Sequence, residues 1–345
     1  MEGLHAILPP SWEATIVQWL HDDMPKWDVG GFVVGECVRS HAQGRPALCL
    51  TRRAAAHRDP NSATLLAKAP GVLAGLPFVD AVFEFLGCEV EWLREEGAAI
   101  SEAEAADRTP VATVTGPTRK LLAGERTALN ILSRCSGVAT ATRAAVDLGA
   151  AHGWHGSVAG TRKTTPGFGL IEKYGLLVGG GDTHRMDLSG MVMLKDNHIW
   201  STGSITASVE RARSACGFST KIEVECTSVQ DGVEACEAGA DVIMLDNFTA
   251  ETLPRAAQTL KERFPQVIIE ASGGISAEML PDFFSPHVDI ISQGDLTNGC
   301  APPLRGTRAR MEPAVCNSAR RYDTLDFSLK VPKPEEFARR QQAKI

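Results

Sequence analysis

The chain has few of the features that mark secreted, membrane-spanning or disulfide-linked proteins. No apolar run approaches the roughly 18 residues that a membrane-spanning helix needs. Residues 1–20 lack the basic start of a signal peptide, and Pro9, Pro10 and Glu13 interrupt their apolar residues. The nine cysteines are scattered and form no Cys-x-x-Cys pair, as is typical of a reducing compartment. We therefore expect a cytoplasmic protein, and the nucleus is an alternative location.

An excess of basic residues is also missing. The formal net charge is −7, which argues against a general nucleic-acid binder, so any basic site must be local. The sequence contains no Ser/His/Asp arrangement, H-E-x-x-H motif, Walker loop or G-x-G-x-x-G turn. The 345 residues, 43% hydrophobic and 22% charged, are typical of one large globular domain or two unequal ones.

Residues 156–294 repeat one unit, in which a short apolar strand ends in a polar residue and a helical stretch follows. The strand ends lie at 158–163, 191–195, 221–225, 242–246, 267–272 and 288–294. This pattern predicts a parallel α/β barrel, in which the carboxyl ends of the strands converge on one mouth. Several strands deliver a charged or small polar group to that mouth, which a purely structural barrel does not need. We therefore interpret the chain as an enzyme.

The flanking segments mix helical and strand patterns. They predict a helix start at Ser11-Trp12, helices over 81–86, 125–132 and 140–148 with an interruption at Ser136-Gly137, and strands over 111–115 and 325–331. Residues 37–59 and 299–321 are rich in Arg, Ala, Pro and Cys and lack periodicity, so we expect surface loops there.

The densest chemical signal is the segment 160–167, a basic and hydroxyl-rich loop that follows the first strand of the repeat. Arg162 can grip a planar carboxylate through two parallel hydrogen bonds, and Lys163 offers a point charge to a phosphate. The alternative is a solvated turn with incidental charges, which the position at a strand end disfavours.

Further cations follow at the next strand ends. His184 and Arg185 end a glycine-rich loop and either could bind an anion, although a lone histidine is often only a hydrogen-bond partner. Lys195 could form a Schiff base, neutralise a phosphate, or pair with Glu225 or Asp246.

Two carboxylates lie at neighbouring strand ends. Period-two spacing places Lys221, Glu223 and Glu225 on the inner face of one strand, and Asp246 ends the next strand. Burying such charges is costly unless they are paired or bind a metal. Glu225 and Asp246 suit Mg²⁺, directly or through water, and the alternative is a salt-bridge network with Lys195 and Lys221.

The last two strands end in small residues, at Ser272-Gly273-Gly274 and at Gly294. Small residues allow backbone N–H groups to approach a phosphate, and late strands are the usual phosphate site of such barrels. The expected ligands are therefore strongly anionic: a sugar phosphate, a pyrophosphate with Mg²⁺, and a carboxylate.

These motifs together resemble the quinolinate phosphoribosyltransferase family, also called carboxylating nicotinate-nucleotide pyrophosphorylases. The resemblance is carried by residues 69–75, 125–132, 160–167, 172–174, 184–185, 195–198, 223–225, 245–247 and 270–274. It covers most of the chain, and the segments 37–59 and 299–321 look like surface insertions relative to the family.

The resemblance implies an α/β fold with an N-terminal α/β sandwich domain over residues 1–137, to which 323–345 return, and an incomplete TIM-like α/β barrel over 138–300. It implies a pentosyltransferase that moves the phosphoribosyl group of phosphoribosyl pyrophosphate to quinolinate with decarboxylation. The products would be nicotinate mononucleotide, pyrophosphate and CO₂, in NAD biosynthesis, with Mg²⁺ as cofactor.

The resemblance also implies the roles of individual residues. Lys163, Lys195, Glu225 and Asp246 would be catalytic, and the two carboxylates would handle the ribose and Mg²⁺. The implied substrate-binding residues are Arg126, Thr161, Arg162, Lys163, His184, Arg185, Lys195, Glu225, Asp246, Ser272, Gly273, Gly274 and Gly294.

The family further implies a homodimer, possible in larger assemblies such as a hexamer, in which Arg126 reaches the partner's site. No nucleic-acid or membrane partner is expected. Two other functions stay open on the residues alone: a phosphoribosyltransferase for a monocarboxylate that does not decarboxylate, and a barrel that only binds a phosphorylated ligand or acts as a scaffold. The intact Lys195, Glu225 and Asp246 count against the scaffold.

Overall fold

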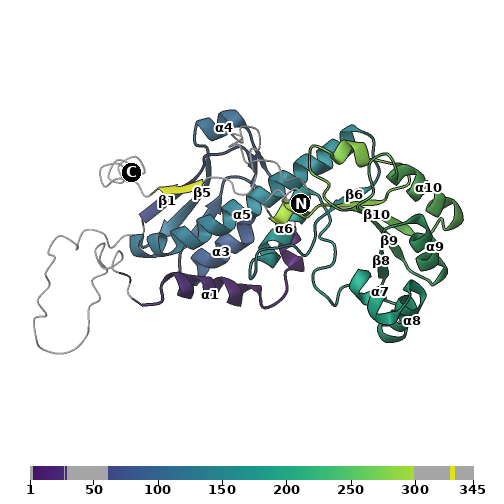
Figure 1. Cartoon of the computed structure of the whole chain (residues 1–345). Helices are drawn as coiled ribbons and strands as arrows, with labels where there is room; N and C mark the ends of the chain where they lie inside the picture. The colour runs from purple at the N-terminus through teal and green to yellow at the C-terminus, as the bar shows by residue number, and fades with distance from the viewer. Residues whose placement is uncertain (1–2, 27, 29–60, 299–326, 331–345) are drawn as a thin grey trace, which may run out of the picture. The chain divides into compact units, whose positions relative to one another are not determined.

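The computed structural model describes residues 3–26, 28, 61–298 and 327–330 (Figure 1). The chain divides into two compact units, one comprising Met1–Gly137 with Thr324–Ile345 and the other Val138–Asp323, called unit 1 and unit 2 below. The predicted insertions at 37–59 and 299–321 lie outside the described residues, as does most of the predicted return segment 323–345.

The elements of unit 1 are η1 (Leu4–Ile7), α1 (Trp12–Asp23), β1 (Asn61–Ala67), β2 (Gly71–Val72), α3 (Leu76–Phe85), β3 (Glu89–Trp92), β4 (Ala99–Ile100), α4 (Glu102–Ala106), β5 (Pro110–Gly116), the first part of α5 (Thr118–Ala151) and β12 (Phe327–Lys330). Unit 2 holds the rest of α5, then β6 (Ser157–Ala159), α6 (Gly169–Gly179), β7 (Val192–Leu194), α7 (Asp196–Thr202), α8 (Ile205–Cys216), β8 (Ile222–Cys226), α9 (Val229–Glu237), β9 (Val242–Asp246), α10 (Leu253–Arg263), β10 (Ile268–Ser272), η3 (Leu280–Phe283), β11 (Ile290–Ser292) and α11 (Asp295–Asn298).

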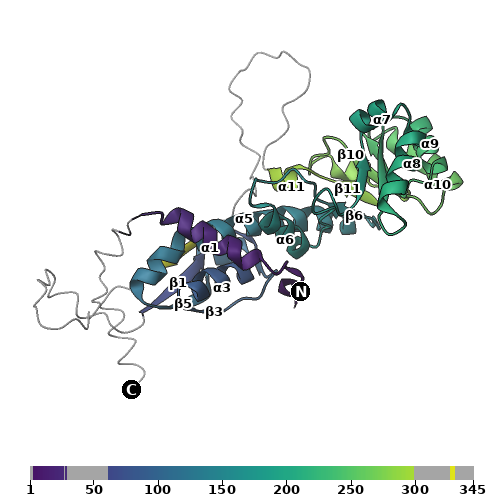
Figure 2. The ribbon, with the colours of Figure 1, turned by 90° about the horizontal axis from the view of Figure 1, so that it is seen from below.

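Unit 1 is built on an antiparallel sheet in the order β12-β1-β5-β3. The strand predicted over 325–331 is confirmed as β12, which pairs with β1 and places Leu329 opposite Leu65. One face of the sheet meets α3 and α5, where Leu65, Phe83, Leu132 and Leu329 surround a small apolar cavity. Helix α1 packs beside α3 (Figures 1 and 2) and begins at Trp12 as predicted.

The predicted interruption at Ser136-Gly137 is wrong, because α5 runs unbroken through both residues. The Ser136 side chain is fully buried, and its hydroxyl accepts from the backbone N–H of Ala74 at 2.9 Å and donates to the Ala74 carbonyl at 3.1 Å. The serine therefore satisfies the backbone N–H and carbonyl of Ala74 in a neighbouring loop, and does not cap a helix end. None of the described helices is both long and apolar enough to cross a membrane.

Unit 2 is an open, TIM-like barrel. All six strands predicted for the repeat are confirmed, and they form one parallel sheet in the order β6-β11-β10-β9-β8-β7. This order follows the chain around a ring that is broken between β7 and β6. Asp182 forms a parallel bridge to Ala159 on the free side of β6, and no pairing among the described residues links that edge to β7.

The alternation of residues along the strands separates an apolar outer face from a polar inner one. Ile222, Val224, Ile243, Leu245 and Ile269 are buried against the outer helices. Helices α8, α9 and α10 lie outside the strands (Figures 1 and 2). The intervening residues point inward and are Glu223, Glu225, Met244, Asp246, Glu270 and Ser272. The barrel therefore carries its charged groups on the inside, toward the carboxyl ends of the strands.

Candidate active site

A cleft of about 980 Å³ lies at the carboxyl ends of the parallel strands in unit 2. Its walls are Thr161, Arg162, Lys163, His184, Arg185, Met193, Lys195, Glu225, Met244, Asp246, Asn247, Glu270, Ser272, Gly273, Gly274 and Ser292. A smaller pocket of about 150 Å³ shares part of this lining and adds Gly294 and Asp295. Every site residue predicted within unit 2 thus lies at this mouth, whereas Arg126 belongs to unit 1 and is exposed on α5.

The basic loop between β6 and α6 is fixed from several directions. The backbone N–H of Lys163 donates to Thr161 Oγ1 at 3.1 Å, and the Lys163 carbonyl accepts from Thr297 Oγ1 at 2.9 Å. Farther along, Thr165 donates through its backbone N–H at 2.9 Å and its hydroxyl at 2.7 Å to the buried carboxylate of Glu172. These bonds hold the loop in a shape that presents its two cations to the cleft.

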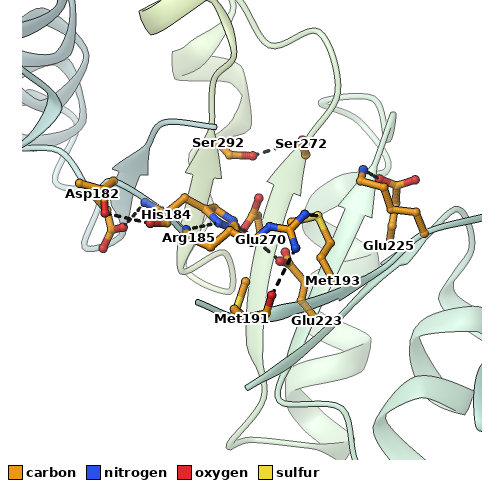
Figure 3. Close-up of polar contacts among 12 residues, drawn as sticks. Asp182, His184, Arg185, Met191, Met193, Glu223, Glu225, Glu270, Ser272 and Ser292 are labelled. Carbon is orange, nitrogen blue, oxygen red and sulfur yellow. Dashed lines mark hydrogen bonds and ion pairs between the residues drawn. The ribbon is translucent and has the colours of Figure 1, made fainter. Parts of the chain in front are cut away.

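His184 lies in a tight turn on the free side of β6 (Figure 3). Its φ of 54° is in the left-handed region, which non-glycine residues rarely occupy. The backbone N–H of His184 donates to Asp182 Oδ1 at 2.6 Å, and the ring Nε2 lies 2.9 Å from Glu270 Oε2. The ring thereby connects the turn to β10 across the inside of the barrel.

Arg185 follows in the same turn and lines the cleft. Its guanidinium donates to the Met191 carbonyl at 3.2 Å and to Met193 Sδ at 3.4 Å. Burial, together with the neighbouring Arg162, lowers the pKa of Arg185 from its ordinary value. A partly buried guanidinium beside another cation is an environment that favours a bound anion.

Lys173, on α6, is a buried cation whose role the sequence did not indicate. Its Nζ contacts the carbonyl of Thr183 and donates to the carbonyl of Arg185 at 3.2 Å. Burial lowers the pKa of Lys173 to about 8, an effect that Asp182 opposes and the nearby arginines reinforce. The only signal in the sequence was its place in the motif 172–174, because a lysine on a helix otherwise suggests an exposed side chain.

Two carboxyl groups lie beneath the turn. Glu223 and Glu270 are both buried, and Glu223 Oε2 lies 3.8 Å from His184 Nε2. Burial, and then the adjacent Glu270, raise the pKa of Glu223 well above its usual range. Lys221 was expected on the same inner face, but it is exposed, because it precedes β8 at the end of the strand away from the cleft.

At the other side of the cleft, the Nζ of Lys195 contacts Glu225 Oε2. Of the interpretations left open for Lys195, the structure shows the ion pair with Glu225; the wider network with Lys221 is not formed, because Lys221 is exposed. Asp246 is half-buried and receives a hydrogen bond from the side chain of Asn247. Burial, and then the charge of Glu225, raise the pKa of Asp246.

The smaller pocket is shaped by residues without bulk. Gly273 has a φ of 104°, and a Cβ atom there would lie 2.6 Å from the backbone nitrogen of Asn247, so only glycine fits. The hydroxyl of Ser292, on β11, donates to the hydroxyl of Ser272, on the neighbouring strand β10, at 3.2 Å. The pocket therefore exposes backbone and hydroxyl groups in the manner expected for a phosphate cradle.

Several residues of the cleft wall were not predicted. Met193, Met244 and Glu270 each lie two positions before a residue that was predicted, and so share its face of the strand. Period-two spacing alone could therefore have found them. Ser292 has the same spacing relative to Gly294, and the signal for Asn247 was its place in the motif 245–247.

Taken together, the fold and the cleft define a barrel enzyme for strongly anionic, phosphorylated ligands. Comparison with known proteins agrees with this class. Residues 50–136 match the family model described as the quinolinate phosphoribosyl transferase N-terminal domain, and residues 138–303 match the model of its C-terminal domain. The chain belongs to the quinolinate phosphoribosyltransferase family.

Individual relatives are similar over most of their length. The chain is 48% identical over 304 residues to the human carboxylating nicotinate-nucleotide pyrophosphorylase, covering 88% of this chain and 93% of that protein. It is 44% identical over 297 residues to the Dictyostelium discoideum protein of the same name, covering 83% and 92%. The crystal structure of NadC from Streptococcus pyogenes matches with a TM-score of 0.74 at 30% identity, covering 94% of this chain and 97% of that one.

Proposed function

We propose that the cleft of unit 2 is the active site at which this chain transfers the phosphoribosyl group of phosphoribosyl pyrophosphate to quinolinate. The reaction releases pyrophosphate and CO₂ and gives nicotinate mononucleotide, for NAD biosynthesis. The observation that carries the assignment of the site is the gathering of Arg162, Lys163, Arg185 and Lys195 around one cleft. Both substrates are multiply anionic, and the chain as a whole is negative, so a local cluster of cations is what their binding requires.

Quinolinate binds at the end of the cleft that holds Arg162 and Arg185. Each guanidinium can grip one of the two ring carboxylates through two parallel hydrogen bonds. His184 lies beside them in the wall of the cleft. The lowered pKa of Arg185 supports this placement, because a bound carboxylate would repay the cost of burying its charge.

The 5′-phosphate of the ribose binds in the smaller pocket. Ser272, Gly273, Gly274 and Gly294 offer backbone N–H groups and a hydroxyl there, with Thr161 at the shared edge. Lys163 lines both the pocket and the main cleft, and so can contact a phosphate in either.

Glu225 and Asp246 fit a Mg²⁺ ion, held directly or through water. Both are carboxylates in the same cleft wall, and the mutual repulsion that contributes to the raised pKa of Asp246 is what a divalent cation would relieve. The ion would supply positive charge to the pyrophosphate oxygens. Lys195, which contacts Glu225, adds a further cation at this end of the cleft and can interact with the same oxygens.

The reaction then depends mainly on positioning and charge. The pyridine nitrogen of quinolinate, held in line by the arginines, bonds to C1 of the ribose as the bond from C1 to the pyrophosphate oxygen breaks. The electron pair of that bond leaves with pyrophosphate, whose charge Lys163 and Lys195 stabilise. The alkylated ring nitrogen is cationic, so it stabilises the electron pair left on the ring when the adjacent carboxylate departs as CO₂. A proton then replaces the lost carboxylate, and no covalent enzyme intermediate is needed.

We also propose that the chain forms a homodimer, which can assemble into a larger oligomer such as a hexamer. Arg126 is exposed on the part of α5 that belongs to unit 1. The family resemblance assigns this residue to the active site of the partner subunit, where it would add a cation to the quinolinate end. A cytoplasmic location fits the cysteines, since Cys88, Cys216, Cys226 and Cys236 are thiols and not disulfide partners.

The decisive experiment follows ¹⁴CO₂ from quinolinate labelled in the carboxylate next to the ring nitrogen. Release that requires both phosphoribosyl pyrophosphate and Mg²⁺, in equal amount to nicotinate mononucleotide formed, is the expected result. Nucleotide formation from nicotinate without CO₂ release would instead show a monocarboxylate phosphoribosyltransferase. Binding of phosphoribosyl pyrophosphate without any turnover would show a binding protein.

A further inference from the structure

The ring of His184 is hydrogen-bonded by the protein at both nitrogens. The backbone N–H of Arg185 donates to Nδ1 at 2.8 Å, and a backbone amide can only donate, so Nδ1 is an acceptor without a proton. Nε2 must then carry the proton of the neutral ring, and it lies 2.9 Å from Glu270 Oε2. The direction of both hydrogen bonds is therefore fixed: the amide of Arg185 donates to the ring, and the ring donates to Glu270.

We propose that Glu270 is a positioning residue for quinolinate recognition: it holds the neutral His184 ring, and the ring holds the backbone of Arg185. This inference rests on the proposed function of the cleft, and in particular on Arg185 as a quinolinate ligand. It differs from the direct contact with the substrate that the family resemblance implies for His184. A ring whose two nitrogens are already engaged can bind a carboxylate only by breaking one of these bonds.

The conformation of the turn supports a positioning role. A histidine with a φ of 54° is strained, and such a conformation persists only where the surroundings fix it from several sides. Here Asp182 accepts from the His184 backbone N–H at 2.6 Å, and the Nζ of Lys173 contacts the carbonyl of Thr183 and binds that of Arg185. Glu270, on β10, adds the hydrogen bond that joins the turn to another strand across the inside of the barrel (Figure 3).

The consequence for Arg185 follows from its own contacts. Its guanidinium is held by the Met191 carbonyl at 3.2 Å and by Met193 Sδ at 3.4 Å, two ordinary and weak interactions. These bonds orient the guanidinium only if its backbone is already in place. The ladder of the sheet does not continue past Asp182 among the described residues, so side chains must fix that backbone. The His184–Glu270 bond, with both side chains at most 9% exposed, is one of these contacts.

A metal ion is the competing explanation for this cluster. Ligand atoms of His184, Glu223 and Glu270 all lie within 4.8 Å of one another, a spacing that could hold a divalent cation. A cation there would have to displace the proton on Nε2, so the two explanations require different states of the histidine ring. The state of the ring therefore decides between them.

The test compares Glu270→Gln with Glu270→Leu. Glutamine keeps an oxygen that can accept from Nε2, and leucine does not. We expect the quinolinate KM to rise about tenfold or more in Glu270→Leu and less than about threefold in Glu270→Gln, the range of one lost hydrogen bond. The phosphoribosyl pyrophosphate KM should change less than about twofold in both, because Glu270 acts only through the turn. Equal rises in both KM values, or no rise in either, would overturn the proposal.

A second measurement needs no turnover. In ¹⁵N spectra of histidine-labelled protein without substrate, the His184 signal, assigned by its loss in His184→Asn, should be that of a neutral ring protonated at Nε2. It should change to a mixture of tautomers in Glu270→Leu. An imidazolium, an Nδ1-protonated ring, or about one tightly held metal ion per chain that is lost in Glu270→Gln would each refute the proposal.

If Glu270→Leu does not fold, His184→Asn replaces it, because asparagine tolerates a positive φ while lacking the bridge to Glu270. The same selective rise in the quinolinate KM is expected, and an unchanged value contradicts the proposal. If instead the wild-type protein releases no CO₂ while its His184 ring is neutral and Nε2-protonated, the proposed function fails and the structural assignment of the ring stands.

Discussion

Lys195 and Glu225 form an ion pair across two adjacent strand ends of the cleft. Their side chains are 43% and 16% exposed, so water screens the pair and its contribution to stability is small. Both partners also line the cleft, where a substrate anion or a cation can replace either one. The pair is therefore better explained by the chemistry of the cleft than by folding.

This explanation predicts different effects on activity and stability. Glu225→Gln and Lys195→Met should each lower kcat by roughly a hundredfold or more, because each removes a charge that acts on the reacting groups. The free energy of unfolding should change by less than about 1 kcal/mol, as for other exposed pairs. Steady-state kinetics and urea denaturation of the same preparations provide the check. A loss of several kcal/mol with normal turnover per folded molecule would show that the pair is structural.

Arg162 is expected to recognise one carboxylate of quinolinate. In Arg162→Ala the quinolinate KM should rise by an amount equivalent to roughly 2–4 kcal/mol, because the carboxylate loses its charged partner. Arg162→Lys is the matched control, since it keeps the charge but not the two parallel hydrogen bonds, and it should be intermediate. Binding of phosphoribosyl pyrophosphate, measured by calorimetry, should be nearly unchanged. Unaltered quinolinate kinetics in Arg162→Ala would remove this residue from the site.

The proposed Mg²⁺ site predicts a pH dependence of activity through Asp246. Its pKa is raised by burial and by Glu225, so as the pH falls Asp246 takes up a proton earlier than an ordinary aspartate would. Activity should therefore be lost on the acid side at a higher pH than for an exposed carboxylate, and excess Mg²⁺ should shift this limb back toward lower pH.

The variant Asp246→Asn separates the metal role from a structural one. It should weaken activity, move the Mg²⁺ optimum to higher concentration and lose the acid limb that Asp246 causes. If the variant unfolds while its residual activity keeps a normal Mg²⁺ response, Asp246 serves the fold and not the metal.

Lys173 predicts an unusual dependence of stability on alkaline pH. Its pKa is about 8 in the folded chain against 10.5 for an ordinary lysine, so between these values the unfolded chain holds more protons. The free energy of unfolding should rise with pH across this window, by at most about 1.4 kcal/mol per pH unit from this group, and the full cost of the buried charge should be present below it. Denaturation of the wild type and of Lys173→Gln from pH 7 to 10 tests this. Parallel curves for the two proteins would show that Lys173 does not titrate in that range.

The shared site of the proposed dimer can be tested by complementation. Arg126→Ala and Lys195→Ala homodimers should both be folded and nearly inactive. After subunit exchange about half of the dimers should be mixed, each with one doubly altered site and one intact site. Activity should then recover to about a quarter of the wild type. If mixed dimers isolated with two affinity tags have no activity, Arg126 does not act in the partner's site.

Much of unit 2 could be predicted because its signals are local. The six strands are short segments with apolar residues on their outer face, each ending near a polar or small residue. Parallel strands bring these ends together, so the sequence alone assigns Arg162, Lys195 and Asp246 to one mouth. Ser136 misled the prediction because its hydroxyl, which on a helix usually suggests an end, instead bonds to Ala74, 62 residues away.

The contacts that hold the turn of residues 183–185 could not be predicted, because they also join residues that are far apart in the sequence. His184 and Glu270 are 86 residues apart, and nothing in either local sequence indicates that the ring spans the barrel. The buried Nζ of Lys173 is satisfied by the carbonyl groups of Thr183 and Arg185, which belong to a separate turn. Contacts of this kind depend on how the open sheet curves, and sequence periodicity carries no information about partners across a barrel.

The break in the ring between Asp182 and β7 has a consequence for how this enzyme can change. Strands paired by backbone hydrogen bonds constrain each other, so a substitution that shifts one strand also displaces its neighbours. The turn that carries Arg185 is anchored instead by individual side chains, each encoded by one codon. The part of the barrel that we propose binds quinolinate is therefore the part that can change one residue at a time, while the strands of the proposed phosphate pocket stay intact.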